Sequence, residues 1–198
     1  MKKFLIVAAM AVVASAANAV DLLWSGDTTG DPTWNRPSGM TTLSGSGTAV
    51  PYEVQPFYVT ATGNYVFEAF YARATSWDGY IFIYSGSFNA GTPLVGLQDG
   101  DDDFTGTFTV LTGSGTGLNA SRIASTETSN FNDPAGSMLM ANTQYYAVVT
   151  GFSNTSFGVY DAGIGGGPGD VVAGMVPEPA SMIALGAGLL ALARRRRK

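Results

Sequence analysis

Residues 57–72 read FYVTATGNYVFEAFYA, and this stretch decides the fold class. In its second half the side chains alternate, so that one face of an extended chain carries Tyr65, Phe67, Ala69 and Tyr71 and the other carries Val66, Glu68 and Phe70. A period of two is typical of a β-strand, and Thr62-Gly63 supplies turn residues. The stretch therefore predicts two strands, residues 57–61 and 64–72, joined at Thr62-Gly63.

Segments with a strand-like composition recur farther along the chain. Five more segments are rich in β-branched and aromatic residues and are bounded by Gly, Asn, Asp or Pro, namely residues 80–84, 107–111, 121–125, 145–150 and 157–161. None of them has a helical period. We therefore expect an all-β fold, an antiparallel β-sandwich or jelly roll over residues 20–162, with residues 21–51 adding one or two edge strands and long loops.

The N-terminus has the three parts of a secretory signal peptide. Lys2 and Lys3 precede an apolar run over residues 4–13, and small residues follow up to Ala17-Asn18-Ala19. The run is too short to cross a membrane comfortably. We expect residues 1–19 to form a signal helix that is cleaved after Ala19, with Ala17 and Ala19 as the recognition residues.

The C-terminus carries a second targeting segment. We expect residues 163–175 to form a Gly-rich linker, followed by Val176-Pro177-Glu178-Pro179, a short apolar helix over residues 180–193 and a terminal basic run. Fourteen helical residues span roughly 21 Å, which is short of the ~30 Å hydrocarbon core. The run Arg194-Arg195-Arg196-Arg197-Lys198 would stop in the cytoplasm, so that the domain lies on the opposite side of the membrane.

This tail resembles the PEP-CTERM sorting signal of bacterial surface proteins. The resemblance covers residues 176–198 and rests on the Pro-Glu-Pro motif, the apolar run and the basic end, in that order. It implies processing near Pro177–Pro179 by an exosortase, which is a membrane cysteine protease. It also implies export to the cell envelope, the cell surface or an extracellular polysaccharide matrix of Gram-negative bacteria.

The charge of the middle of the chain limits its partners. Between Val20 and Met175 three arginines stand against fourteen acidic residues, which gives a net charge of −11. Phosphate recognition needs clustered Lys and Arg, so nucleic acid is excluded as an expected partner. Cations, or neutral and weakly charged polymers, suit this surface better.

The residue inventory also limits the chemistry. The stretch after residue 19 and before the tail has no His, Cys or Lys. Ser-His-Asp and Cys-His catalysis, Schiff-base chemistry and zinc sites of the His or Cys kind each need one of these residues. Paired carboxylates, as in a glycosidase, remain open, with candidates that include Glu53, Glu68 and Glu127.

One acidic stretch is a candidate metal site. Asp99, Asp101, Asp102 and Asp103 fall within five residues that we expect to lie between two strands, with Gly100 at the turn. Oxygen ligands at this density suit Ca²⁺, although the spacing is not that of an EF-hand. Asp78, at the expected start of a strand, is a further candidate ligand. A solvated acidic turn without a metal explains the same residues.

Aromatic residues in or beside the expected loops are candidates for sugar stacking. They are Trp24, Trp34 and Trp77, with Tyr52 and Phe88. The alternative is that these rings close the ends of the sandwich as part of its core.

The middle of the chain is similar to bacterial pre-peptidase C-terminal domains, which are β-sandwich accessory modules of secreted proteins. The similarity runs from about Phe57 to Tyr160 and includes Trp77-Asp78-Gly79-Tyr80, Asp101-Asp102-Asp103 and the strand Gln144–Phe152. The stretch between Asp103 and Ser121 is longer than is usual for that family.

Together these observations predict an exported, non-enzymatic protein that needs no cofactor, with the acidic stretch as its candidate site for stabilisation by Ca²⁺. Its expected role is structural, or the binding of a ligand or an extracellular polysaccharide. The expected partners are the processing protease and, before processing, the membrane. A glycosidase or a dedicated carbohydrate-binding module is the alternative.

Overall fold

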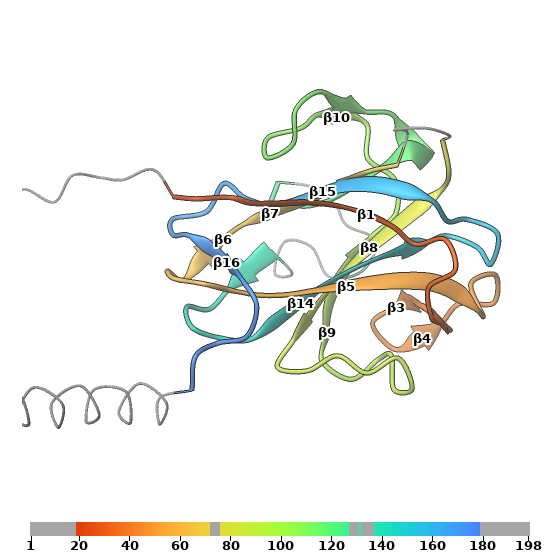
Figure 1. The fold of residues 1–198 in the computed structure, drawn as a ribbon, viewed down its shortest axis with the longest axis horizontal. Coiled ribbons are helices and arrows are strands. Elements are labelled where there is room, and N and C mark those ends of the chain that lie inside the picture. The colour runs from red at the N-terminus through yellow and green to blue at the C-terminus, as the bar shows by residue number, and fades with distance from the viewer. Residues whose placement is uncertain (1–18, 72–75, 127–130, 132–136, 179–198) are drawn as a thin grey trace, which may run out of the picture.

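The domain consists of two packed sheets (Figure 1), and the alternating apolar residues of the stretch 65–71 belong to the core between them. A computed structural model describes residues 19–71, 76–126, 131 and 137–178 of the chain. The first sheet has four antiparallel strands in the order β1 (Leu22–Asp27), β15 (Val159–Gly165), β7 (Val66–Phe70) and β12 (Ala120–Ile123).

The second sheet is larger and is also antiparallel throughout. Its order is β16 (Val171–Ala173), β5 (Val50–Val59), β14 (Tyr145–Gly151), β8 (Gly79–Ser85) and β9 (Leu97–Asp101), and β2 (Thr33–Trp34) pairs with β5. Thr62-Gly63 thus does not close a hairpin within one sheet. It lies in the connection that carries the chain from β5 in the second sheet to β7 in the first.

Several short elements lie outside the two main sheets. Three two-stranded ribbons pair β3 (Pro37–Gly39) with β4 (Thr42–Leu43), β6 (Gly63–Asn64) with β13 (Met138–Leu139), and β10 (Gly106–Thr107) with β11 (Ser114–Gly115). A 3₁₀ turn, η1, covers Gly117–Asn119.

The core lies between the sheets, where the predicted inner face of β7 is buried. Tyr65, Phe67, Ala69 and Tyr71 pack there against Ile81, Val149 and Tyr160, among other residues. A second apolar cluster covers the outer face of the larger sheet and includes Trp34, Tyr80, Phe82, Tyr84 and Val148. The all-β sandwich expected from the sequence is therefore confirmed, and its larger sheet is buried on both faces.

The segment expected to be a strand over residues 107–111 is different. Only Gly106–Thr107 pairs as a strand, because the amides of residues 109–111 turn toward the outer face of β7. There the buried carboxylate of Glu68 accepts from the N–H groups of Thr109 (2.8 Å), Val110 (2.8 Å) and Leu111 (2.9 Å). The Arg122 guanidinium lies 3.4 Å from the same carboxylate. Glu68 therefore fixes a loop over its sheet, and we call residues 108–113 the covering loop.

The expected linker over residues 163–175 belongs in part to the sandwich, so the expected boundary at residue 162 is wrong. β15 runs to Gly165, and β16 adds a strand beside β5. The glycines of β15 leave room for side chains in β1 and just before it. A Cβ on Gly163 would lie 2.7 Å from Leu23 Cδ2, and one on Gly165 would lie 1.9 Å from Asp21 Oδ1. Here glycine permits close packing rather than flexibility.

The two ends of the domain lie together. The Val20 N–H donates to Asp170 Oδ1 at 2.9 Å, and the Val171 N–H donates to the Val20 carbonyl at 2.9 Å. In Figure 1 the chain enters β1 and leaves after β16 on the same side of the sandwich. The expected signal peptide up to residue 18, with Ala17, and residues 179–198, with Pro179, the apolar run and the basic end, lie outside the described residues.

We predict that Glu68→Gln lowers the free energy of unfolding by about 1–3 kcal/mol, because an amide NH₂ would face backbone donors that lose their acceptor. Urea denaturation measures this loss. Hydrogen exchange should speed up at the amides of Thr109, Val110 and Leu111 in particular.

The matched control is Glu53→Gln, since Glu53 Oε2 accepts from one side-chain donor, the Tyr160 hydroxyl, at 2.8 Å. Its effect should be smaller and should leave exchange at residues 109–111 unchanged. Equal losses in the two variants would contradict the role given to Glu68.

Candidate functional site

The acidic stretch is divided by the fold into two parts. Asp99 and Asp101 lie within β9 and are buried, which contradicts the expectation that all four acids occupy one turn. Asp99 Oδ1 accepts from the Gly100 N–H at 2.8 Å, and Asp101 Oδ2 accepts from the Arg122 N–H of β12 at 2.8 Å. Asp101 thereby joins the two sheets, so its role is structural.

The other two acids join a partner from outside the stretch. β8 and β9 are antiparallel with Ile81 opposite Asp101, and this pairing brings the residue before β8 close to the residues after β9. Asp78, Asp102 and Asp103 each offer one carboxylate oxygen, and these oxygens lie within 4.8 Å of one another. We call these three residues the acidic cluster.

Two oxygens of the acidic cluster lack partners. Asp78 Oδ1 and Asp102 Oδ1 are shielded from solvent and have no hydrogen-bond partner among the described residues. Buried polar atoms are nearly always satisfied in folded proteins, because leaving one unpaired costs about 1–3 kcal/mol. A bound cation would satisfy both oxygens at once.

Protonation is the alternative way to relieve this charge. Burial, reinforced by Asp103, raises the pKa of Asp78 to about 6, and Arg36 opposes the shift. Burial, with Asp103 and Asp78, likewise raises the pKa of Asp102 to about 7. The pKa of Asp101 rises to about 7, chiefly through burial. These carboxyls therefore take up and release protons between about pH 6 and pH 7.

A polar cavity adjoins the acidic cluster through Asp102. Its volume is about 380 Å³, and its lining consists of Arg36, Ser38, Ser44, Gly45, Ser46, Tyr80, Asp102 and Phe152. Arg36 lies between the Tyr80 and Phe152 rings, 4.3 and 4.8 Å from their centroids. Its Nε and Nη2 donate to the Phe152 carbonyl at 2.9 and 2.7 Å. The rigidly held Arg36 thus faces an open polar space large enough for water.

The donor set fits a hard divalent cation. Ca²⁺ takes six to eight oxygen ligands, and three carboxylates provide the anionic part of such a shell, with water from the cavity side able to complete it. Soft metals are disfavoured because the chain has no Cys or His. Of the acids singled out in the sequence, the structure brings Asp78, Asp102 and Asp103 together and places Asp99 and Asp101 within β9.

The three tryptophans considered for sugar stacking pack in or against the apolar core. Trp34 is 3% exposed and donates to Thr150 Oγ1 at 3.1 Å, and Trp77 is 9% exposed and donates to the Val159 carbonyl at 3.0 Å. Trp24 is half-buried and stacks on Phe67 with ring centroids 5.8 Å apart. Tyr52 and Phe88 pack against the cluster around Trp34. The alternative interpretation, rings that close the core, describes all five.

The carboxylates considered for glycoside hydrolysis are also engaged in the fold. The covering loop and Arg122 enclose Glu68, and Glu53 accepts from Tyr160, whose hydroxyl in turn accepts from Trp24 Nε1 at 3.3 Å. Glu127 lies outside the described residues. Glu53 and Glu68 therefore do not form the pair of carboxylates, facing each other across a cleft, that glycoside hydrolysis needs.

The sorting motif begins where the domain ends. Gln144 holds this junction: its Oε1 accepts from the Val176 N–H at 2.8 Å, and its Nε2 donates to the Gly174 carbonyl at 3.4 Å. Pro177 and Glu178 follow and are exposed. In the described part of the chain, no helix has the length and apolar character needed to cross a membrane.

A family model described as the PEP-CTERM protein-sorting motif matches residues 176–198. No curated protein matches the chain at a significant level. The motif supports an exported protein that is sorted to the cell envelope or surface and processed by exosortase, a membrane protease. The resemblance of the tail found in the sequence is thereby confirmed, and that of the middle domain stays a prediction.

We predict that the cation-free protein loses stability as pH rises from 5 to 8. A carboxyl whose pKa is higher in the folded than in the unfolded chain binds more protons when folded, so raising pH from about 4 to about 7 favours unfolding. Three such carboxyls, Asp78, Asp101 and Asp102, should lower the free energy of unfolding by at least about 1 kcal/mol, after allowance for solvent screening.

Urea denaturation with a chelator at pH 5 and pH 8 measures this change. The groups that face these carboxyls are Asp99, Asp103 and Arg36, and the chain has no histidine to titrate in the same window. Asp102→Asn should reduce the difference between the two pH values. A protein at least as stable at pH 8 as at pH 5 would contradict the raised pKa values.

Proposed function

We propose that the chain is a non-enzymatic protein of the bacterial envelope or extracellular matrix, whose β-sandwich is stabilised by Ca²⁺ and serves a structural or ligand-binding role. The observation that carries the calcium part is the pair of buried, unpartnered oxygens in the acidic cluster. The sorting motif supports the location.

The arrangement of the termini suits a domain presented at a membrane. Val20 and Asp170 are hydrogen-bonded, so the two targeting segments join the sandwich at neighbouring points. Both can therefore enter one membrane while the domain stays folded on the far side. Gln144 fixes the chain up to Val176, and Pro177 and Glu178, which begin the Pro-Glu-Pro motif, are exposed immediately after this junction.

An external location also suits the calcium proposal. A site that meets its ion only after export needs modest affinity, and three carboxylates with waters are typical of weak sites. Buried like charges destabilise the cation-free fold at neutral pH. Ca²⁺ binding would therefore make the stability of the domain depend on the Ca²⁺ concentration outside the cell.

The non-enzymatic assignment rests on what the side chains do. The region between the signal peptide and the tail lacks His, Cys and Lys, and Glu53 and Glu68 are tied into the fold. A glycosidase is the competing function. Time-dependent release of reducing ends from a polysaccharide, lost on removal of one carboxylate, would contradict our proposal.

We predict that saturating Ca²⁺ raises the melting temperature at pH 8. At a free concentration 100 times the dissociation constant the gain is about 2.7 kcal/mol, or roughly 5–10 °C for a domain of this size. Asp103→Asn should abolish most of the gain, since Asp103 is exposed and belongs to the acidic cluster. Differential scanning fluorimetry with Ca²⁺ or a chelator measures both.

Two controls separate binding from folding. Asp27→Asn alters an exposed acid outside the acidic cluster and should keep the full gain. Asp101→Asn should lower the melting temperature with or without Ca²⁺ yet keep most of the gain, because Asp101 bonds the Arg122 N–H. The metal proposal fails if Ca²⁺ leaves the wild-type melting temperature unchanged.

We predict that changing Pro177-Glu178-Pro179 to three alanines in the native cell blocks processing, because the protease loses the motif that it recognises. The precursor tail should then stay attached and the protein should remain in the membrane fraction. Intact-mass measurement of the envelope and medium fractions detects this. Replacing Asp27, which is exposed and lies away from the junction, by Asn serves as the control. Normal processing of the triple-alanine variant would refute the sorting assignment.

A further inference from the structure

The outer face of the four-stranded sheet is only partly covered. Strand register arranges its outward side chains in two rows: one contains Leu23, Gly163, Glu68 and Arg122, and the other contains Ser25, Asp161, Phe70 and Ala120. The covering loop packs on the first row, where a Cβ on Gly163 would lie 2.9 Å from Val110 Cγ1. In the second row Ala120 is fully buried and Phe70 packs against Phe108 of the covering loop with ring centroids 6.0 Å apart, so this row opens to solvent toward Asp161 and Ser25.

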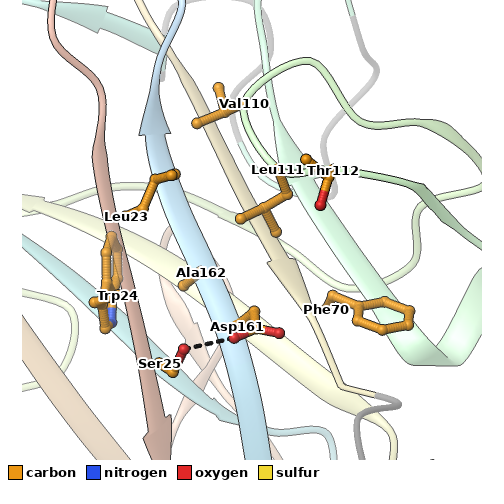
Figure 2. Close-up of a pocket in the computed structure, with 9 residues that line it drawn as sticks. All are labelled: Leu23, Trp24, Ser25, Phe70, Val110, Leu111, Thr112, Asp161 and Ala162. Atoms are coloured by element: carbon orange, nitrogen blue, oxygen red, sulfur yellow. Dashed lines mark hydrogen bonds between the residues drawn. The ribbon is translucent and has the colours of Figure 1, made fainter.

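A pocket of about 340 Å³ forms along this boundary (Figure 2). Leu23, Val110 and Leu111 form its apolar wall, and Ser25, Asp161 and Phe70 lie on its floor. Figure 2 shows the Trp24 ring on the opposite side of β1 from Leu23, so Trp24 meets the pocket only at its margin. The volume falls within the range of small-ligand sites.

The pocket is preformed because both of its sides are fixed. The covering loop is held by the bonds of its amides to the buried Glu68 carboxylate, and the floor is a continuous antiparallel ladder. Ser25 Oγ donates to Asp161 Oδ1 at 2.5 Å, which orients the hydroxyl and the carboxylate toward each other. A ligand therefore meets few groups that must be ordered on binding.

The row on the floor has the chemistry of a sugar-binding surface. Neighbouring strands are about 4.8 Å apart, so a hydroxyl, a carboxylate and a phenyl ring follow one another at sugar-sized intervals. A carboxylate has several lone pairs for sugar hydroxyls, and the apolar C–H face of a pyranose packs on an aromatic ring or on leucine. The charge on the pocket lining is that of Asp161 alone, which disfavours uronates and other anionic ligands.

We infer that this pocket binds a neutral sugar unit of a polysaccharide, with Asp161 and Ser25 bonding its hydroxyls and Phe70 and Leu111 contacting its apolar face. The inference deepens the ligand-binding role proposed above and is independent of the acidic cluster. The pocket suits an internal unit of a long chain, since Ser25 on its floor and Thr112 beside the apolar wall are both exposed.

Saturation-transfer NMR on the full chain in a sugar-free detergent tests the inference and detects weak binding. The probes are neutral gluco-, manno-, galacto- and xylo-hexasaccharides, with a guluronate hexasaccharide as the anionic probe. We expect transfer to at least one neutral probe and none to the guluronate. Asp161→Ala should weaken binding at least about tenfold, the loss expected for a hydrogen bond to a charged group.

Two blocking variants on different elements, Ser25→Trp and Thr112→Trp, should also abolish transfer. Asp27→Ala and Leu43→Ala, outside the pocket, are the matched controls and should bind like the wild type. The inference is overturned if no neutral probe receives transfer, if the pocket variants bind normally, or if a leucine-rich peptide binds where no sugar does.

The calcium response of the same samples separates the two proposals. Sugar binding without a calcium-dependent gain in melting temperature refutes the metal centre alone. A calcium-dependent gain without sugar binding refutes the pocket assignment alone.

Discussion

The strand β7 holds the molecule together through two different interactions on its two faces. Its inner residues, with Phe67 and Ala69 fully buried, supply apolar area to the core between the sheets, at roughly 25 cal/mol for each Å² removed from water. On its outer face the Glu68 carboxylate is buried, and the cost of this burial is offset by backbone amide donors and by the Arg122 guanidinium. The first interaction determines that two sheets pack. The second determines what lies on the outside of one of them, and thus where the pocket in Figure 2 opens.

The excess of acidic residues is distributed among distinct tasks. Glu68 and Asp101 accept backbone N–H groups and so replace missing strand partners. One oxygen each of Asp78 and Asp102 is shielded and lacks a hydrogen-bond partner within the described part of the chain, which suits a cation. Asp161 is half-buried beside a hydroxyl, which suits a neutral ligand. The net charge alone excludes nucleic acid but does not distinguish these tasks, because they depend on which donors the fold brings to each carboxylate.

The same reasoning explains how far the sequence predicted the structure. Alternation is a local signal, so the inner face of β7 and the all-β class were predictable from residues 57–72. The loop over Glu68 was not, since its donors lie more than 40 residues away and residues 107–111 resemble a strand in composition. Glycines in residues 163–165 were interpreted as a linker because their role, to accommodate Leu23 and Asp21, depends on a strand at the other end of the chain. In the acidic stretch, proximity in sequence favoured four candidate ligands, whereas strand pairing brings Asp78 beside Asp102 and Asp103 and places Asp99 and Asp101 within β9.

The position of the termini links the fold to its sorting. A sandwich whose first and last strands lay at opposite ends would have to unfold, or to span its own length, for both targeting segments to engage one membrane. Here Val20 and Val171 are bonded directly, so the last strand is added beside the first residue after the expected signal cleavage. The strand β16 also forms one edge of the larger sheet and pairs with the backbone of β5, which would otherwise be exposed there. The same few residues, 170–176, therefore complete the sandwich and fix the point at which the sorting motif begins. If β16 does not pair with β5, the bond between the Val176 N–H and Gln144 loses the strand that positions it.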